Sequence, residues 1–342
     1  MKGQIRLPLR LNNYVRRKKM KRHIVSIMIF LVGFITIAIS ISSAQTYPSR
    51  PVQFVIPGTP GSIIDITGRI LAEELGKILG QPFIPVNKPG GGFTVGTDFV
   101  AKSKKDGYTL AYTNNPAIVY ARILTPEGVH YDPDKDLEPL GVHLFFAHAI
   151  AVQSSAPWKT FQELIDYVKK NPNKVSVSTP GLGTTTHFQL EIIQSLTGTQ
   201  FNHVPFKSGE AVITALLGGH VDMTFDAISK IAPHVESGKM RMLLVSIKSP
   251  LFPNIPTITE LGYKQDLPAS WFAMYGPAGM PEDVKKVLIP AIEKAVKNPE
   301  LKAKIERMHF TVIYKTPAEQ KRLAKEEYEL ALSIAKKVGL VK

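Results

Sequence analysis

Short apolar runs alternate with segments of helical periodicity from residue 47 onward. The run Val52–Ile56 predicts a strand; after a Gly/Pro-rich loop at 57–62, isoleucine and leucine recur on one helical face from Ile63 to Leu79. Gly80 predicts the end of this helix. The next predicted elements are a strand at Phe83–Val86, a Gly-rich turn at 89–92, a short helix around Val95–Ser103 and a strand at Tyr108–Tyr112. This βαβαβ order predicts a parallel sheet covered by helices.

A second unit with the same alternation begins near residue 150. Thr160 and Glu163 form a capping box for a predicted helix over Phe161–Lys170. The further predicted elements are strands at Lys174–Ser178, Phe201–Val204, Val221–Phe225 and Met240–Ile247, helices at Thr184–Leu196 and Gly209–Leu217, a helix that starts at Pro281, and a last helix from 317 to about Lys337. The predicted fold class is α/β, with two similar halves.

Residues 1–44 differ in character from the rest of the chain. They hold nine Lys and Arg and no acidic residue, and the basic cluster Arg16–Arg22 precedes an apolar run, Ile24–Ile41, and the small residues 42–44. This order predicts a secretory signal peptide that is cleaved after Ala44, so that the mature protein works in the periplasm. The alternative is an uncleaved membrane anchor, because about 18 apolar residues can span a bilayer. Met20 is an alternative start that gives a signal of ordinary length.

Composition removes several functional classes. The net charge is +14, from 42 Lys and Arg against 28 Asp and Glu, but the nine basic residues of the leader account for most of it, so nucleic-acid binding is not predicted. The chain has no Cys, which excludes disulfide scaffolds, thiol nucleophiles and thiolate metal sites. Its nine His show no metal-ligand spacing, and no cofactor or metal is predicted.

Two loops between a predicted strand and a predicted helix are the candidate functional segments. They are 57–62 and 179–184, both rich in Gly, Pro, Ser and Thr. A helix start has unpaired N–H groups and a positive dipole end, so it attracts anions, and ligands of open α/β sheets bind beyond the strand ends where such loops lie. Either loop alone is also what any strand-to-helix turn needs. Neither contains a Walker phosphate loop, and the chain has no Gly-x-Ser-x-Gly nucleophile motif.

From Tyr47 to the C-terminus the sequence resembles the Bug or TctC family, the periplasmic solute-binding proteins of tripartite tricarboxylate transporters. Nine segments carry the resemblance through their order and spacing: Tyr47–Pro51, Pro60–Asp65, Val86–Gly90, Asp106–Leu110, Gly181–Thr184 with His187, Val204–Lys207, Leu217–Asp222, Pro256–Thr257 with Glu260–Gly262, and Pro277–Pro281. The resemblance implies a two-lobed periplasmic binding protein, type II-like, each lobe a mostly parallel sheet flanked by helices. Its lobes would be 47–148 plus 272–342, and 149–271.

The resemblance also implies a site. In that family one ligand carboxylate is held between the two helix-opening loops. Carried over by position, the ligand-binding residues are Thr59, Gly61, Ser62 and Asp65 on one lobe, Thr179, Gly183, Thr184 and Thr185 on the other, Thr113 and Asn114 in the distal pocket, and Asp226 facing the cleft. Asp65 is expected mainly to fix its loop, and His187 to pack the start of its helix. Trp271 is a candidate for the ligand wall.

Five positions in four segments depart from the family pattern. The chain has Gly61-Ser62 in place of Gly-Gly, Gly58-Thr59 in place of Phe-Ala, Ser178 in place of Gly, and Ala227 in place of Asn. The end that binds the carboxylate is therefore intact, whereas the end that selects the ligand is altered.

These observations predict a monomeric, non-enzymatic binding protein. It would capture a small organic carboxylate in a cleft between the lobes and deliver it to the membrane permease subunits of a tripartite transporter. Two alternatives stay open: a sensor that presents the solute to a signalling partner, and a secreted α/β hydrolase. The sequence leaves di- and tricarboxylates, amino acids and aromatic acids all possible as the solute.

Overall fold

The computed structural model describes residues 47–206, 209–249, 252–337 and 341. Arg50–Lys342 form one compact unit, and the predicted leader lies outside the described residues. Within these ranges no helix has both the length and the apolar character that crossing a membrane requires.

The first sheet among the described residues has six strands in the order β11-β4-β10-β3-β1-β2. Its strands are β1 (Val52–Ile56), β2 (Phe83–Asn87), β3 (Thr109–Asn114), β4 (Leu137–Phe146), β10 (Ser270–Pro277) and β11 (Thr311–Lys315). Strand β1 pairs in parallel with β2 and β3, as the βαβαβ pattern predicts. Strand β10 lies between β3 and β4 and is antiparallel to both.

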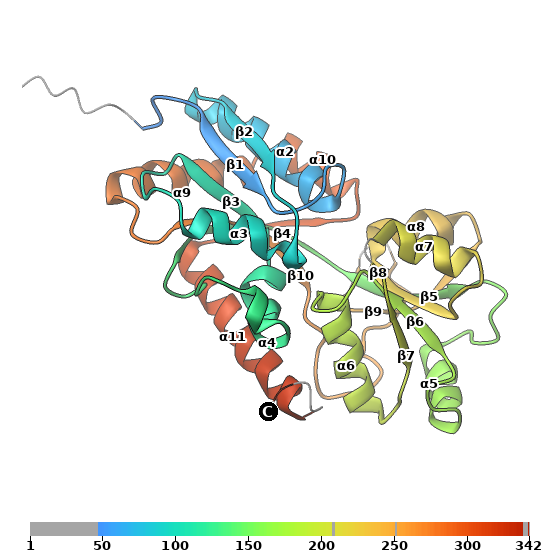
Figure 1. Ribbon diagram of the computed structural model, residues 1–342. Coiled ribbons are helices and arrows are strands. Elements are labelled where there is room, and N and C mark those ends of the chain that lie inside the picture. The colour runs from blue at the N-terminus through green and yellow to red at the C-terminus, as the bar shows by residue number, and fades with distance from the viewer. Residues whose placement is uncertain (1–46, 207–208, 250–251, 338–340, 342) are drawn as a thin grey trace, which may run out of the picture. The chain divides into compact units, whose positions relative to one another are not determined.

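Helices cover both faces of this sheet (Figure 1). They are α2 (Ile63–Leu79), α3 (Thr94–Ala101), α4 (Ala121–Leu124), α9 (Glu282–Val296), α10 (Pro299–Glu306) and α11 (Pro317–Lys337), with short turns of other helix types at 91–93, 116–120 and 126–128. Alternation along β1 sets the two faces. Gly68 of α2 comes so close to Ile56 and Tyr112 that a Cβ there would overlap both side chains, whereas Val55 belongs to a core cluster with Val100 of α3.

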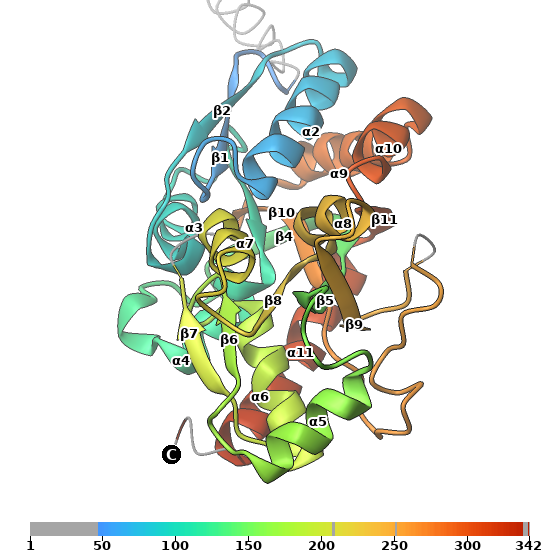
Figure 2. The same cartoon turned by 90° about the vertical axis from the view of Figure 1, so that its right-hand side faces the viewer.

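The second sheet has five strands in the order β7-β6-β8-β5-β9 (Figures 1 and 2). Its strands are β5 (His148–Gln153), β6 (Ser176–Thr179), β7 (Asn202–Pro205), β8 (Met223–Ala227) and β9 (Met240–Val245), and its helices are α5 (Phe161–Lys170), α6 (Thr185–Thr197), α7 (Gly209–Leu217) and α8 (Ile228–Glu236). Ala149 and Ala151 of β5 pack in a cluster with residues of α7 and α8, and Ile150 and Val152 in one with residues of α5 and α6.

The predicted α/β class with two helix-flanked sheets is confirmed, but the sheets are mixed rather than mostly parallel. In the second sheet β6 is parallel to β7 and β8, while β5 is antiparallel to β8 and β9. Strands β5, β10 and β11 run opposite to the other strands of their sheets; β5 and β10 adjoin the crossings between the two sheets, and β11 pairs with β4 at the edge of the first sheet. Neighbouring strands are parallel where a right-handed βαβ crossover joins them within one sheet. A strand that the chain reaches from the other sheet is not joined to its neighbours in this way.

Candidate functional site

The first candidate loop, 57–62, joins β1 to α2 and is held by its own hydrogen bonds. The Ser62 hydroxyl donates to the Thr59 carbonyl over 2.6 Å, and the Ser62 amide donates to the same oxygen over 3.1 Å. Gly61 has a φ of 79°, which favours glycine. A Cβ on Gly58 would lie 2.3 Å from Ile64 Cγ2, so a glycine is required for the tight turn into the helix. The four predicted residues of this loop thus lie together at the start of α2.

Asp65 fixes this loop, as predicted. Its buried carboxylate accepts hydrogen bonds from the Gly61 amide at 2.8 Å, Arg69 Nε at 2.9 Å and Asn87 Nδ2 at 2.8 Å. Burial raises the pKa of Asp65, but the hydrogen bonds from Arg69, Gly61 and Asn87 and the charge of Arg69 outweigh burial, so the pKa is lowered. The aspartate is therefore ionised and paired at neutral pH.

Arg69 and Asn87 support the first loop through Asp65, and the sequence did not single them out. Asn87 ends β2; its Nδ2 also donates to the Gly58 carbonyl at 2.9 Å, and its Oδ1 accepts from Arg69 at 2.8 Å. The Asp65–Arg69 spacing of four residues is a recognisable helix pair and could have been found in the sequence. The contact with Asn87 could not, because it depends on the pairing of β1 with β2.

The second candidate loop, 179–184, joins β6 to α6. Thr184 is the N-cap of α6: its hydroxyl accepts from the His187 amide at 3.3 Å and donates to the Gly181 carbonyl at 2.7 Å. The Gly183 amide, in a backbone with φ of 76°, donates to His187 Nδ1 at 3.2 Å. This contact confirms that His187 packs the start of α6, and it shows that the neutral imidazole accepts from the loop.

A stacked histidine pair supports the second loop. The His187 and His203 rings lie 4.8 Å apart at 13°, and His203 Nε2 lies 2.7 Å from Thr179 Oγ1. Burial lowers the pKa of His187 to about 4, with a smaller contribution from His203, and burial also lowers the pKa of His203. Both rings are therefore uncharged at neutral pH, so the loop is held by neutral groups.

The predicted deeper residues are buried and engaged in hydrogen bonds. Thr113 Oγ1 lies 2.8 Å from Thr97 Oγ1, and Asn114 Oδ1 accepts from the Ala117 amide at 3.3 Å. Asp226, in β8, accepts from the Ala227 amide at 2.7 Å. Thr113 and Asn114 are the last two residues of β3, whereas Asp226 lies inside β8 and not after it.

Thr185 links the second loop to segments of the first sheet. Its hydroxyl accepts from Ser270 Oγ at 2.8 Å and lies 3.5 Å from Asn115 Oδ1. Trp271, the candidate for the ligand wall, is buried, and its indole N–H donates to Glu327 of α11 at 2.6 Å. Its polar atom is thus engaged with α11.

A cavity of about 200 Å³ lies beside α6, at the opposite end of that helix from Thr185. It is lined by Ile192, Ser195, Leu196, Gln265, Leu330, Ser333, Ile334 and Lys337. Within the described part of the chain, no group of three His, Asp or Glu side chains is placed to hold a metal ion. Backbone amides, hydroxyls and neutral imidazoles form the second loop, and the first loop adds the paired Asp65 and Arg69.

Comparison with known proteins decides the family. The family model for the tripartite tricarboxylate transporter family receptor, TctC, matches residues 67–340. This chain belongs to that family. The TctC protein is 35% identical over 303 residues to a UPF0065 protein in the gbd 5′ region of Cupriavidus necator, which covers 88% of this chain and 91% of the relative. It is 29% identical to BugT of Bordetella pertussis over 87% of this chain and 92% of BugT.

Solved structures agree with the fold of this TctC protein. Periplasmic binding protein BugD matches with a TM-score of 0.76 and 28% identity, over 86% of this chain and 99% of BugD. Rpa4515 of R. palustris, solved with adipate, matches with a TM-score of 0.77 and 27% identity, over 86% of this chain and 98% of its own. MatC of Rhodopseudomonas palustris, with bound malate, matches with a TM-score of 0.75 and 25% identity, over 84% of this chain and 99% of MatC. The chain thus has the two-lobed fold of a periplasmic binding protein, and its family consists of solute-binding proteins, which are not enzymes.

Proposed function

We propose that this TctC protein captures a small organic carboxylate in the periplasm and delivers it to the permease subunits of a tripartite transporter. The leader would be cleaved after Ala44, and the lobes would be 47–148 with 272–342, and 149–271. Family membership supports the proposal, as do two relatives whose structures hold adipate and malate. The solute would lie between the loops 57–62 and 179–184.

The observation that carries the proposal is the start of α2. Ser62 is its N-cap but makes no capping hydrogen bond with its side chain, because its hydroxyl is turned back to Thr59. The first-turn amides of this 17-residue helix therefore lack the acceptor that an N-cap side chain usually supplies. A carboxylate from outside the chain is a suitable acceptor, and the helix dipole favours its charge.

The charge of Asp65 does not oppose this role. Its carboxylate is paired with Arg69 and hydrogen-bonded to Asn87, so the negative charge beside the loop is compensated. The neutral His187 and His203 hold the second loop without adding charge. A ligand that contacts both loops favours the closed arrangement of the lobes by its differential contacts, which is how a ligand shifts such an equilibrium.

A carboxylate screen tests the proposal. Thermal unfolding is measured with malate, adipate and a panel of tricarboxylic, amino and aromatic acids, each beside its neutral amide. We expect at least one acid, and not its amide, to raise the unfolding temperature, because a solute at 100 times its Kd stabilises the folded state by about 2.7 kcal/mol.

The Ser62→Leu variant then locates the site. It should lose calorimetric affinity for that acid while the fold is retained, because the new side chain covers the start of α2. Ser155→Leu, at an exposed serine before α5, is the matched control and should bind as the parent does. Equal affinity in the Ser62→Leu protein, or equal stabilisation by acid and amide, would contradict the proposed site.

A further inference from the structure

Glu327 is a buried carboxylate on α11 that three separate segments contact. Asn115 Nδ2, just after β3, donates to its Oε1 at 2.7 Å, and Trp271 Nε1, in β10, donates to its Oε2 at 2.6 Å. The Tyr120 hydroxyl also donates to Oε1. Burial raises the pKa of Glu327, while these three hydrogen bonds act in the opposite direction. The carboxylate thus gathers the donors of three elements around the C-terminal helix.

Asn115 connects this carboxylate to the second sheet. Its Oδ1 accepts from the Trp271 amide at 3.4 Å and from Thr185 Oγ1 at 3.5 Å, and its Nδ2 also donates to the Ala269 carbonyl at 3.1 Å. Thr185 is the first residue of α6 and directly follows the loop 179–184. A continuous path of hydrogen bonds therefore runs from Glu327 through Asn115 to the start of α6.

The start of α6 is tied at a second point. Ser270 Oγ donates to Thr185 Oγ1 at 2.8 Å and lies 3.2 Å from His148 Nε2. Ser270 begins β10 and His148 begins β5, the strands next to the two crossings. Gln189 of α6 lies 3.2 Å from His148 Nδ1 and donates to the Pro268 carbonyl at 2.5 Å. All the side chains of this path are buried. Its members meet where the two crossing segments pass α6.

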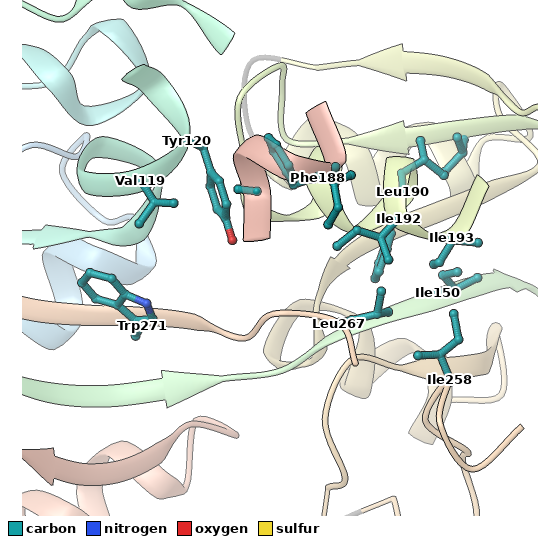
Figure 3. Packing of buried hydrophobic residues seen from close by; sticks show 14 of the residues in the cluster. Val119, Tyr120, Ile150, Phe188, Leu190, Ile192, Ile193, Ile258, Leu267 and Trp271 are labelled. Carbon is teal, nitrogen blue, oxygen red and sulfur yellow. The ribbon is translucent and has the colours of Figure 1, made fainter. Parts of the chain in front are cut away.

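Packing at the same place is apolar and close. The Tyr120 and Phe188 rings stack at 4.8 Å and 15°, and Figure 3 shows these two side chains side by side, with Trp271 near Tyr120. Apolar contact alone would hold α6 against this region. A buried charge adds little stability in comparison. The hydrogen bonds to it form only when donors and acceptor are in the right geometry, so a fully satisfied polar network specifies the position of its members.

We propose that Glu327 is a positioning residue for the solute site: through Asn115 it sets the place of Thr185, and with it the loop 179–184, relative to the first sheet. The proposal rests on the proposed function only in that it takes this loop as part of the solute site. The network favours one arrangement of the two loops over others before any solute binds. Loss of one neutral hydrogen bond changes the ratio of two arrangements by about fivefold.

A distance measurement without solute tests this proposal. The mature chain has no Cys, so the substitutions Lys104→Cys and Lys169→Cys place one spin label near the first sheet and one on α5, both at exposed positions. Electron–electron distance distributions are compared in the parent, Glu327→Gln and Thr185→Val. The glutamine amide would direct N–H groups at Trp271 Nε1 or at Tyr120 and Asn115. The valine lacks the hydroxyl that joins α6 to Asn115 and Ser270.

We expect Glu327→Gln and Thr185→Val each to broaden or displace the spin-label distance distribution. The variant with both substitutions should differ little from either single variant, because both substitutions interrupt one path. Glu329→Gln, at an exposed residue of the same helix, is the matched control and should match the parent. Folded Glu327→Gln and Thr185→Val proteins with the parental distribution would overturn the proposal, even if their unfolding temperature fell. If Glu327→Gln does not fold, Thr185→Val decides alone.

The test separates this proposal from the proposed function. Because no solute is present, failure of malate, adipate and the other acids to bind would count against the proposed function and leave the distance result valid. An unchanged distribution in a chain that binds one of these acids would reject the positioning role alone.

Discussion

At the scale of single residues, the start of α2 depends on Asp65. The carboxylate accepts from Gly61, Arg69 and Asn87 and so joins the loop, the helix and β2 in one cluster. Hydrogen bonds to a charged group contribute more than those between neutral groups. Asp65 therefore both shapes the loop and carries a measurable share of the stability of the first sheet.

We expect Asp65→Asn to lower the free energy of unfolding by about 1–3 kcal/mol at pH 7, because the neutral amide is a weaker acceptor for Arg69 and directs N–H groups at other donors. The folded-state pKa of Asp65 is lowered. This stabilisation is therefore complete above the unfolded-state pKa of about 4 and is lost as the pH falls through the folded-state value. Urea unfolding at pH 7 and pH 3 should show that the parent and Asp65→Asn differ less in their free energy of unfolding at pH 3.

Glu73→Gln is the control for this experiment. Glu73 pairs with Lys77 at the same four-residue spacing on the same helix, but both side chains are exposed, so the change should be small. A pH-independent difference between the parent and Asp65→Asn would show that the loss comes from the shape of the side chain and not from its charge.

Sequence patterns place Asp65 and the loop but not the residues that neutralise it. Ser62, Asp65 and Thr184 lie at helix starts, and helix starts are marked locally by glycine, hydroxyl and acidic residues. Asn87 reaches Asp65 over 22 positions because β1 and β2 pair. Glu327 meets Asn115 over 212 positions. Contacts of this kind follow from strand order, which hydrophobic periodicity does not specify.

At the scale of elements, the helices begin in different ways. Thr160 caps α5 and Thr184 caps α6 by accepting from the amide three residues on, and Glu163 returns a bond to the Lys159 amide. The bond from the Glu163 amide to Thr160 is one half of the capping box that the sequence predicts for α5; the Glu163 carboxylate accepts from Lys159 in place of Thr160. Ser62 of α2 lacks a side-chain cap. The same hydroxyl chemistry therefore has a purely structural use at α5 and lies beside the proposed solute loop at α6.

The pair Thr184→Val and Thr160→Val separates these uses. Each removes one capping hydroxyl, so both should lower the free energy of unfolding by about 1 kcal/mol in urea. Only Thr184→Val should weaken calorimetric binding of the acid found in the screen, because its hydroxyl also holds the Gly181 carbonyl. Equal affinities in the two variants would remove Thr184 from the site.

Most elements of the two sheets follow from the sequence, and the exceptions have two causes. Strand β1, helix α2 and helix α5 begin and end where the pattern predicts. Strands β4, β5, β10 and β11 were not predicted as elements. Each pairs antiparallel with its neighbours, and β4 leads into β5 without a helix between them, so the strand–helix alternation on which the prediction rests does not mark these strands. Helix α8 contains Pro233, which the pattern treats as a break.

At the scale of the whole molecule, the first 44 residues are predicted to act only in export. We expect the secreted protein to begin at Gln45, by N-terminal sequencing and intact mass, because the small residues 42–44 suit signal peptidase. The precursor mass would decide between Met1 and Met20 as the start. Ala44→Asp should leave the leader attached. A full-length chain in the membrane fraction of the parent would favour the uncleaved anchor.

The strand order has a consequence for how an exported chain assembles. Strand β10, at 270–277, lies between β3 and β4, which are complete by residue 146. A chain that crosses the membrane N-terminus first therefore delivers β1 to β4 well before the strand that unites them. Once residue 245 has crossed, and before β10 follows, the second sheet has all its strands and can form, whereas the first exposes unpaired strand edges to the surroundings. During secretion the second sheet would thus fold before the first, although the first sheet contains the earliest strands. Protection of β1 to β4 by a periplasmic chaperone would matter most in that interval.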